Sequence, residues 1–316
     1  MIFLLIIFPI SCYGDIDLTD MQGWQIIIPQ AASEAELFAA EQFQTFLLQS
    51  ADIHLPIKHG GMDCNKVFIG YNRQSELEKL KSAEYGEEGF AIAVEANNIY
   101  IAGGRPRGTL YGVYTFLEDY IGVRFLTADH TYVPKIVKNK KIKSVYRTYV
   151  PPLRYRHVYS GELIIPQDDS TKLFLNRLRI NALEANLPDK LGTTVGLSVI
   201  GHSFGSQMPT RLYGAEHPEY YALYENRRLS NVENDWSGTQ LCLTNHDVLQ
   251  KIIAVVEREI DKSPKLKNFS VGQNDNYFFC RCDKCRTIDE QEGTPMGSLL
   301  TFVNAVAEHI EKQHPD

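Results

Sequence analysis

The second half of the chain alternates between short strand patterns and amphipathic helix patterns, and this alternation limits the possible folds most strongly. Strand patterns cover residues 154–159, 181–185 and 269–271, and helix patterns cover 170–178, 245–260 and 294–310. Alternation of this kind implies a parallel sheet covered by helices. An eightfold β/α barrel needs about 250 residues, more than lie between Pro152 and Asp316. The sequence therefore predicts an α/β fold with an incomplete barrel over 151–316, apparently only its first half, and is interpreted as a fragment.

The first half shows a pattern typical of a compact α+β domain. Strand patterns cover 24–28, 67–69, 90–94, 100–102 and 123–126, and helix patterns begin near Ser33 and Pro106. Ser33-Glu-Ala-Glu36 has the spacing of a capping box, and Asn97-Asn98 favours a hairpin turn. Pro106 suits the first turn of a helix. A basic stretch over 137–143 leads into Pro151-Pro152, which predicts an accessory domain over 15–145 and a boundary before residue 151.

The N-terminus carries the only long apolar run, Met1–Ile10. Ten residues cannot span a bilayer, which needs about 20, and no other segment is suited to cross a membrane. Together with the small residues Cys12 and Gly14, the run predicts a signal peptide over 1–14 and export to the periplasm, cell surface or medium. Two alternatives stay open. One is a lipid anchor at Cys12, although Pro9 suits that signal poorly. The other is a buried first strand, because no Lys or Arg precedes the apolar run as it would in a typical signal peptide.

Charge and missing motifs exclude several function classes. The net charge of −7 argues against a general nucleic-acid binder, which would usually be basic. The chain has no H-E-x-x-H, P-loop or G-x-G-x-x-G motif, so zinc proteases, NTPases and dinucleotide enzymes find no support. No redox or nucleotide cofactor is implied. The 17 tyrosines suit polar ligands such as sugars.

Several long motifs carry a resemblance to known families. Gly89-Phe90 together with residues 101–118 resembles the domain that precedes the barrel in α-glucuronidases and β-hexosaminidases. His217-Pro-Glu-Tyr-Tyr221 resembles a second family, as do residues 240–245, 273–276 and 292–298. That family is the domain of unknown function 4838, which commonly follows such an N-terminal domain. The resemblance covers Trp24 to Asp316. It implies a glycoside-hydrolase-like barrel from exported, polysaccharide-degrading systems, with a carbohydrate that is possibly uronic-acid-containing as substrate or ligand. A shared fold alone does not define the reaction.

The strand pattern at 269–271 ends in Gln273-Asn-Asp-Asn276, one carboxylate among three amides. Glycoside hydrolysis needs a carboxylic acid near the leaving oxygen and a second carboxylate as base or nucleophile. In the resembled glycosidases the acid follows the fourth barrel strand, which makes Asp275 the candidate general acid. Those families carry Asp-Glu or Glu at this place, so the acid role is a hypothesis, and the alternative is a loop whose side chains satisfy local backbone groups. No matching second carboxylate is evident. Further candidates for contact with the sugar are Gln273, Asn274, Asn276, His202, Asn186 and Tyr221, the last being either a stacking platform or a core residue.

Four cysteines form a second candidate constellation. Cys280, Cys282 and Cys285 follow a C-x-C-x2-C spacing, and Cys242 is available as a fourth ligand. Thiolates at this spacing suit a structural zinc ion. Export favours two disulfides instead, and free thiols remain a third alternative. Catalysis is expected to require no cofactor.

Two other functions remain as alternatives to a glycoside hydrolase. The main one is a non-catalytic carbohydrate-binding protein on the same scaffold. The more distant one is a serine esterase, because Gly201-His-Ser-Phe-Gly205 matches a nucleophile elbow with Ser203 as nucleophile. Pro209 falls where the helix of such an elbow should continue, which argues against it.

Overall fold

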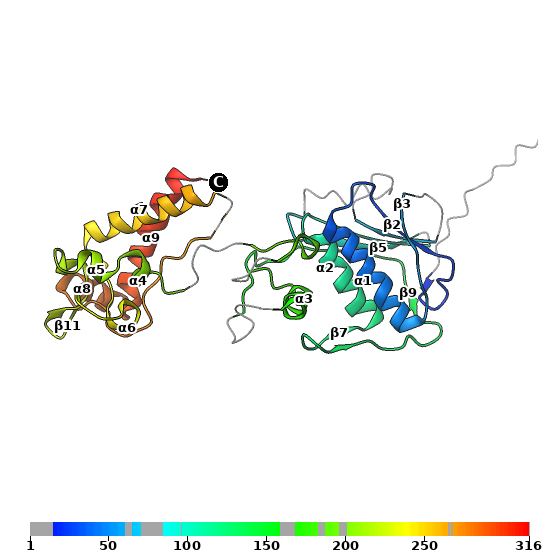
Figure 1. Ribbon diagram of the computed structural model, residues 1–316, viewed down its shortest axis with the longest axis horizontal. Coiled ribbons are helices and arrows are strands. Elements are labelled where there is room, and N and C mark those ends of the chain that lie inside the picture. The colour runs from blue at the N-terminus through cyan, green and yellow to red at the C-terminus, as the bar shows by residue number, and fades with distance from the viewer. Residues whose placement is uncertain are drawn as a thin grey trace, which may run out of the picture. The chain divides into compact units, whose positions relative to one another are not determined.

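We describe the protein from a computed structural model (Figure 1). It describes residues 15–60, 65–70, 85–95, 97–158, 168–182, 187–195, 201–264, 266 and 268–315. The predicted signal peptide with Cys12 lies outside these residues, as does Asn186. The chain divides into two compact units, Met1–Val195 and Gly196–Asp316. This division falls within the region predicted to form the barrel. It lies well after the boundary that the basic stretch and Pro151-Pro152 predicted before residue 151.

The first unit is built on a six-stranded mixed sheet with the order β10-β5-β6-β4-β2-β3. The strands are β2 (Gln25–Ile28), β3 (Ile57–His59), β4 (Lys66–Ile69), β5 (Phe90–Glu95), β6 (Asn98–Gly103) and β10 (Val145–Tyr149). Strands β3, β2, β4 and β6 run parallel, and β5 pairs antiparallel with both β6 and β10. The predicted hairpin is thereby confirmed as β5–β6.

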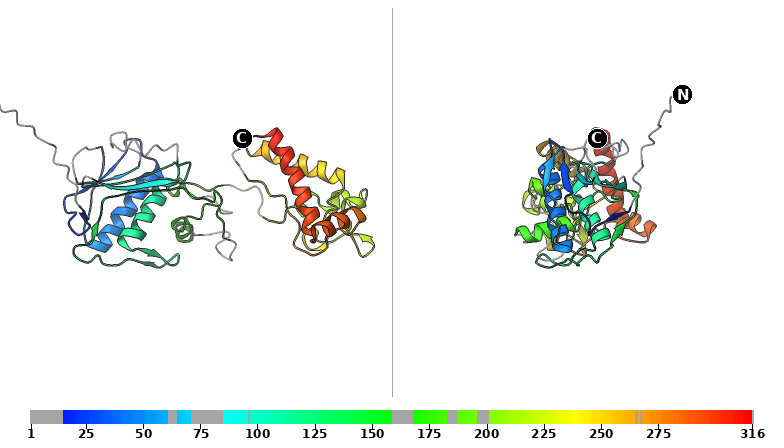
Figure 2. Two further views of the ribbon diagram at one scale, coloured as in Figure 1. Left: turned by 180° about the vertical axis from the view of Figure 1, so that it is seen from behind. Right: turned by 90° about the vertical axis from the view of Figure 1, so that its right-hand side faces the viewer.

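Two helices, α1 (Glu34–Ala51) and α2 (Gly108–Phe116), lie side by side against one face of this sheet (Figures 1 and 2). The capping box at the start of α1 is confirmed: Ser33 Oγ accepts from the Glu36 N–H at 3.2 Å, and Glu36 Oε2 accepts from the Ser33 N–H at 2.8 Å. Helix α2 begins two residues after Pro106, because Arg107 occupies the N-cap. At Gly108, a Cβ atom would lie only 2.3 Å from the Gly89 carbonyl oxygen, so this junction requires glycine.

Short elements complete the accessory part of the first unit. A five-residue π-helix, η2 (Leu117–Ile121), continues α2. The predicted strand at 123–126 is present as β7 (Arg124–Phe125), which pairs with β8 (Thr131–Tyr132), and β1 (Ile16–Asp17) pairs with β9 (Lys141–Ile142). The core between sheet and helices is aromatic and aliphatic, with the Phe43 and Phe116 rings 5.3 Å apart.

The segment after β10 differs from the prediction. It contains α3 (Asp169–Arg177), close to the predicted helix, and the 3-10 turn η4 (Asp189–Leu191). The described parts of the predicted strands at 154–159 and 181–185 form no strand, so these two predictions are wrong there. The segments still lie side by side, because the Asn181 and Ala182 N–H groups donate to the Arg156 carbonyl, and the Val195 N–H donates to the Asn181 carbonyl. No closed sheet occurs among the described residues, and the barrel is not confirmed.

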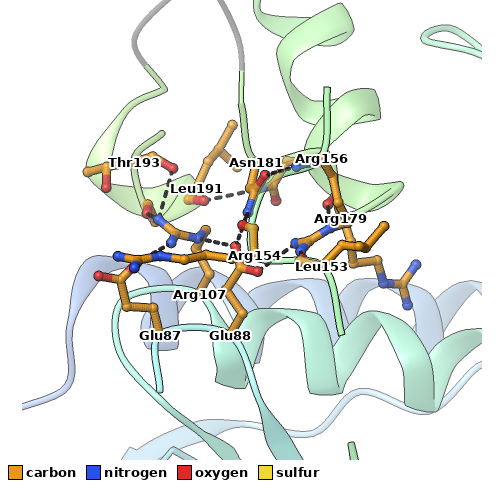
Figure 3. A network of polar contacts seen from close by, with 12 residues as sticks. Glu87, Glu88, Arg107, Leu153, Arg154, Arg156, Arg179, Asn181, Leu191 and Thr193 are labelled. Atoms are coloured by element: carbon orange, nitrogen blue, oxygen red, sulfur yellow. Dashed lines mark hydrogen bonds and ion pairs between the residues drawn. The ribbon is translucent and has the colours of Figure 1, made fainter. Parts of the chain in front are cut away.

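A buried polar network joins these segments to the sheet (Figure 3). Glu88 receives Arg107 Nε at 2.7 Å, Arg156 Nη2 at 2.6 Å and Asn181 Nδ2 at 2.7 Å. Arg107 is only 2% exposed and also donates to the Gly192 carbonyl at 2.9 Å. Arg107, at the N-cap of α2, therefore has a structural role. One carboxylate here links the hairpin, α2 and the segment after β10.

The second unit is mostly helical. Its elements are α4 (Phe204–Gln207), α5 (Thr210–Tyr213), η5 (Pro218–Tyr220), β11 (Leu223–Tyr224), β12 (Arg227–Arg228), α6 (Asp235–Gly238), α7 (His246–Lys262), α8 (Asp283–Glu292) and α9 (Met296–Gln313). Asn245 caps α7 as predicted, with Oδ1 accepting from the Asp247 N–H at 2.9 Å. Apolar faces of α7 and α9 form its core. Residues 269–271 form no strand, so that prediction is wrong. None of the described helices has the length and apolar character to cross a membrane.

Candidate functional site

The turn that carries Asp275 is anchored at its start by Ser203. The N–H groups of Ser203 and Phe204 donate to the Gly272 carbonyl at 3.1 and 3.0 Å, and the Gly272 N–H donates to Ser203 Oγ at 2.9 Å. The Ser203 side chain is completely buried. These contacts hold residues 269–272 beside residues 201–204 through isolated hydrogen bonds.

Asn274 locks the turn from inside the protein. Its side-chain Nδ2 donates to the carbonyls of Asp235 and Thr239, both at 2.9 Å, and its Oδ1 accepts from the Gly205 N–H at 2.7 Å. Gln240 accepts from the Asn274 N–H at 3.0 Å and donates to the Asn274 carbonyl at 2.8 Å. Asn274 is buried, and both of its side-chain N–H groups are used internally, so the geometry gives it a positioning role instead of contact with a sugar.

Asn276 fixes the other side of the turn. Its Nδ2 donates to the carbonyls of Trp236 and Thr239 at 3.0 and 2.9 Å, and its Oδ1 accepts from the Phe278 N–H at 3.0 Å. Two locked amides therefore flank Asp275, whose side chain is 84% exposed. The alternative reading of this motif, in which amides satisfy local backbone groups, fits Asn274 and Asn276 but does not account for Asp275.

The exposed side chains around this carboxylate are here called the Asp275 surface: Gln273, Asp275, Tyr277, His202 and Trp236. His202 Nδ1 lies 2.8 Å from the Gln273 carbonyl oxygen, and His202 Nε2 lies 3.9 Å from Asp275 Oδ1. The Trp236 ring approaches the His202 ring edge-on at 6.4 Å and is 49% exposed. Tyr277 is 88% exposed. A carboxylate, an imidazole and two aromatic rings are thus presented to solvent from one set of loops.

Sequence reasoning missed Trp236 and Tyr277. One of the chain's two tryptophans stands in the polar segment Asn234-Asp-Trp-Ser-Gly238, where a buried ring would not be expected, and Tyr277 directly follows the motif. Beside the Trp236 loop lies a hollow of about 550 Å³, within the range of small-molecule sites. Its lining includes Tyr224, Glu225, Arg227, Glu233 and Phe278.

Tyr221 does not join this surface. Its ring is fully buried, its hydroxyl donates to the Met208 carbonyl at 3.2 Å, and burial raises the pKa of this hydroxyl well above its usual range. Of the two alternatives for Tyr221, the structure fits the core residue and contradicts the stacking platform. Asn186 lies outside the described residues, so its contact with a sugar stays a prediction.

The four cysteines do converge. The Sγ atoms of Cys242, Cys280, Cys282 and Cys285 all lie within 4.8 Å of one another, and those of Cys242 and Cys282 are 3.7 Å apart. All four thiols are free, and a disulfide would require about 2.05 Å between sulfurs. Hydrogen bonds from the thiols of Cys280 and Cys285 lower the pKa of Cys242.

Ser203 is not placed as a nucleophile. Its Oγ is buried against the Gly272 backbone, and none of the described histidines hydrogen-bonds to it. Helix α4 has only four residues, and Pro209 follows it as the N-cap of α5. A serine hydrolase needs the hydroxyl exposed and next to a base.

We therefore expect no covalent labelling of the folded chain by a fluorophosphonate probe, detected by intact-protein mass spectrometry. A heat-unfolded sample and an active serine esterase are the controls for background and probe activity. Labelling of the folded chain that disappears in Ser203→Ala would contradict the assignment.

The domain that precedes the α3 segment belongs to a class associated with glycosidases. Residues 16–119 match the family described as glycosyl hydrolase family 20, domain 2. Residues 125–316 match the family described as domain of unknown function (DUF4838), and the chain belongs to this family. The resemblance drawn from the sequence motifs is thereby confirmed. The relation to glycoside hydrolases is therefore shown for residues 16–119.

Solved glycosidase structures are similar at low identity. A chitobiase of Flavobacterium johnsoniae is 15% identical, covers 96% of this chain and 50% of its own, and has a TM-score of 0.44. A β-N-acetylhexosaminidase of Streptomyces coelicolor is 12% identical over 94% of this chain and 61% of its own, with a TM-score of 0.42. A family GH115 4-O-methyl-α-glucuronidase with specificity for decorated arabinogalactans is 12% identical over 92% and 40%, with a TM-score of 0.44.

This chain spans less than two thirds of the length of each of these three enzymes. None of the curated proteins matches it. At such identities the similarity does not transfer an activity.

Proposed function

We propose that the chain acts as a glycoside hydrolase on a complex polysaccharide or glycan, with uronic-acid-containing chains among the candidate substrates and Asp275 as general acid. The observation that carries this proposal is the fixed turn, which exposes the Asp275 carboxylate to solvent beside His202. The exposed Trp236 ring lies next to His202, and the exposed Tyr277 follows Asp275 by two residues. Membership of a family that follows a glycosyl hydrolase domain supports the carbohydrate class. We also propose that residues 1–14 direct export.

The chemistry assigns a role to each group on the Asp275 surface. Protonated Asp275 would donate to the glycosidic oxygen as the bond to the sugar breaks, and a second carboxylate would act as base or nucleophile. Trp236 and Tyr277 would stack on sugar rings, since an aromatic ring offers a flat apolar face with a polar edge. Gln273 and His202 would hydrogen-bond to hydroxyl groups.

The high exposure of Asp275 favours the second candidate, a carbohydrate-binding protein without catalysis. Glycosidic bond cleavage benefits from a site that excludes water, and an 84% exposed carboxylate is surrounded by water until a ligand covers it. A binding protein needs only the aromatic rings and the hydrogen-bonding groups.

A test uses a panel of soluble polysaccharides, with new reducing ends and affinity measured on the same samples. For both functions Trp236→Ala is expected to weaken glycan affinity about tenfold, or about 1.4 kcal/mol, through loss of the stacking face. Tyr132→Ala removes an equally exposed ring from the other unit and should leave affinity unchanged.

New reducing ends with the wild-type chain would support the hydrolase, and affinity without reducing ends would support the binding protein. Equal effects of the Trp236 and Tyr132 substitutions would argue against a ligand at the Asp275 surface.

A further inference from the structure

We propose that Cys242, Cys280, Cys282 and Cys285 together bind one structural zinc ion through their thiolates. Four ligands at the tetrahedral Zn–S distance of about 2.3 Å have sulfur atoms about 3.8 Å apart. The Cys242 and Cys282 sulfurs are 3.7 Å apart, and all four lie within 4.8 Å of one another. The donor set and its spacing thus fit zinc closely.

The burial of the cluster points to a structural site. Cys242, Cys280 and Cys285 are buried, and they pack with Ala222 in a small apolar cluster of their own. Four protein ligands fill the tetrahedron of zinc and leave no open position for water or substrate. Two disulfides are a weaker fit, because four sulfurs that all approach one another are not arranged as two separate bonded pairs.

The groups around the sulfurs suit thiolates. The Leu223 N–H donates to Cys280 Sγ at 3.3 Å, and Thr244 Oγ1 lies 3.3 Å from Cys285 Sγ. The Arg228 guanidinium lies close enough to the cluster to interact with the sulfurs of Cys242, Cys280 and Cys282. A zinc ion with four thiolates carries a net charge of −2, which this guanidinium partly offsets. Such outer contacts fix and tune metal ligands.

The four cysteines lie in two segments that are far apart in the sequence, and a bound ion would link these segments. Cys242 lies three residues before Asn245, the N-cap of α7, whereas Cys282 is the N-cap of α8 and Cys285 lies in its first turn. Cys280 follows the turn of Asp275 by five residues. Binding forms four Zn–S bonds and releases the thiol protons to solvent. The ion would therefore hold the starts of two helices together beside the Asp275 turn.

Elemental analysis of the whole chain tests the proposal. The protein is purified without chelators or affinity metals, and we expect one zinc per chain. Cys282→Ser removes the least buried ligand and should lower the zinc content more than about tenfold. Cys64→Ser leaves all four proposed ligands in the sequence and should keep the zinc content unchanged. Iron in place of zinc, no metal, or equal zinc loss in both variants would overturn the proposal.

A measurement on the wild-type chain remains decisive if Cys282→Ser fails to fold. Stepwise titration of the thiols with a mercurial reagent should release zinc, followed with a colorimetric indicator, as the four cluster thiols react. Replacement by cobalt should give the absorption of tetrahedral cobalt with thiolate ligands. Intact mass under non-reducing conditions that is lower by the hydrogens of two disulfides, with peptides linking the four cysteines, would overturn the site.

Discussion

Replacing Glu88 by alanine is expected to destabilise the first unit by about 3–5 kcal/mol, because it removes the buried anion that the buried Arg107 and the partly buried Arg156 share. Arg107 Nε and Arg156 Nη2 both donate to this carboxylate, at 2.7 and 2.6 Å, and Asn181 does so as well. Arg107 keeps its hydrogen bonds to carbonyl groups and its ion pair with Glu87, but that carboxylate is 54% exposed and offsets the buried charge less. Glu88→Gln should cost less than alanine but more than a surface change, since it keeps the shape and loses the charge.

Glu87→Ala is the matched control, because Glu87 contacts Arg107 Nη2 at 2.6 Å but is 54% exposed. Exposed pairs contribute about 0–1 kcal/mol. Trp24 and Trp236 lie one in each unit, so urea unfolding followed by tryptophan fluorescence in a Trp236→Phe background reports on the first unit. We expect the urea midpoint of Glu88→Ala to fall by more than about 1 M. Equal shifts for the Glu87 and Glu88 variants would show that burial of the network contributes nothing.

Asp275→Asn is expected to lower kcat/KM for glycan hydrolysis by about 10²–10⁴-fold, the usual contribution of a general acid. Asparagine keeps the size of the side chain but cannot transfer the proton to the leaving oxygen. The stability of the fold should not change, because the carboxylate is exposed and the turn is held by Asn274 and Asn276. The measurement is the initial rate on whichever polysaccharide the wild-type chain cleaves.

Asp169→Asn serves as the control for removal of one exposed negative charge, since Asp169 is 91% exposed on α3. Its rate should equal that of the wild type. A substrate whose aryl leaving group needs no proton should restore part of the lost Asp275→Asn activity, which separates acid catalysis from loss of binding. An unchanged rate with every substrate would remove Asp275 from the catalytic role.

Local signals in the sequence predicted the accessory sheet and its helices well. The capping box at Ser33 and the amide cap at Asn245 act within one helical turn, so neither depends on tertiary contacts. The edge strand β10 was missed, since its Val145–Tyr149 pattern lies between a basic stretch and two prolines that favour a linker. Only its pairing with β5 makes it a strand.

The extended segments of the expected barrel were harder to predict. Sequence patterns at 154–159 and 269–271 favour extended backbone, but a strand also needs a continuous hydrogen-bonded neighbour. Here the neighbours are joined by side chains and single backbone contacts, as at Ser203 and Gly272. Such partners are non-local and leave no periodic trace in the sequence.

The candidate site was predicted in part. The motif around Asp275 was found from its residue types, and so was the convergence of the four cysteines. The sequence did not distinguish the exposed Asp275 from the buried Asn274 beside it. Which of the two side chains points inward depends on how Gln240 holds the backbone of Asn274, through its N–H and its carbonyl. The exposure of Trp236 and Tyr277 likewise depends on loop packing.

The Glu88 network has a consequence for how the two family regions can be separated. Glu88 and Arg107 lie within the region matched by the first family, whereas Arg156 and Asn181 lie within the second. Strand β10, from the second region, also completes the edge of the sheet beside β5. Cutting the gene between the two regions would separate Glu88 from Arg156 and Asn181 and would expose the β5 edge of the sheet. The two family regions are therefore expected to be inherited together, because part of the second region completes the fold of the first unit.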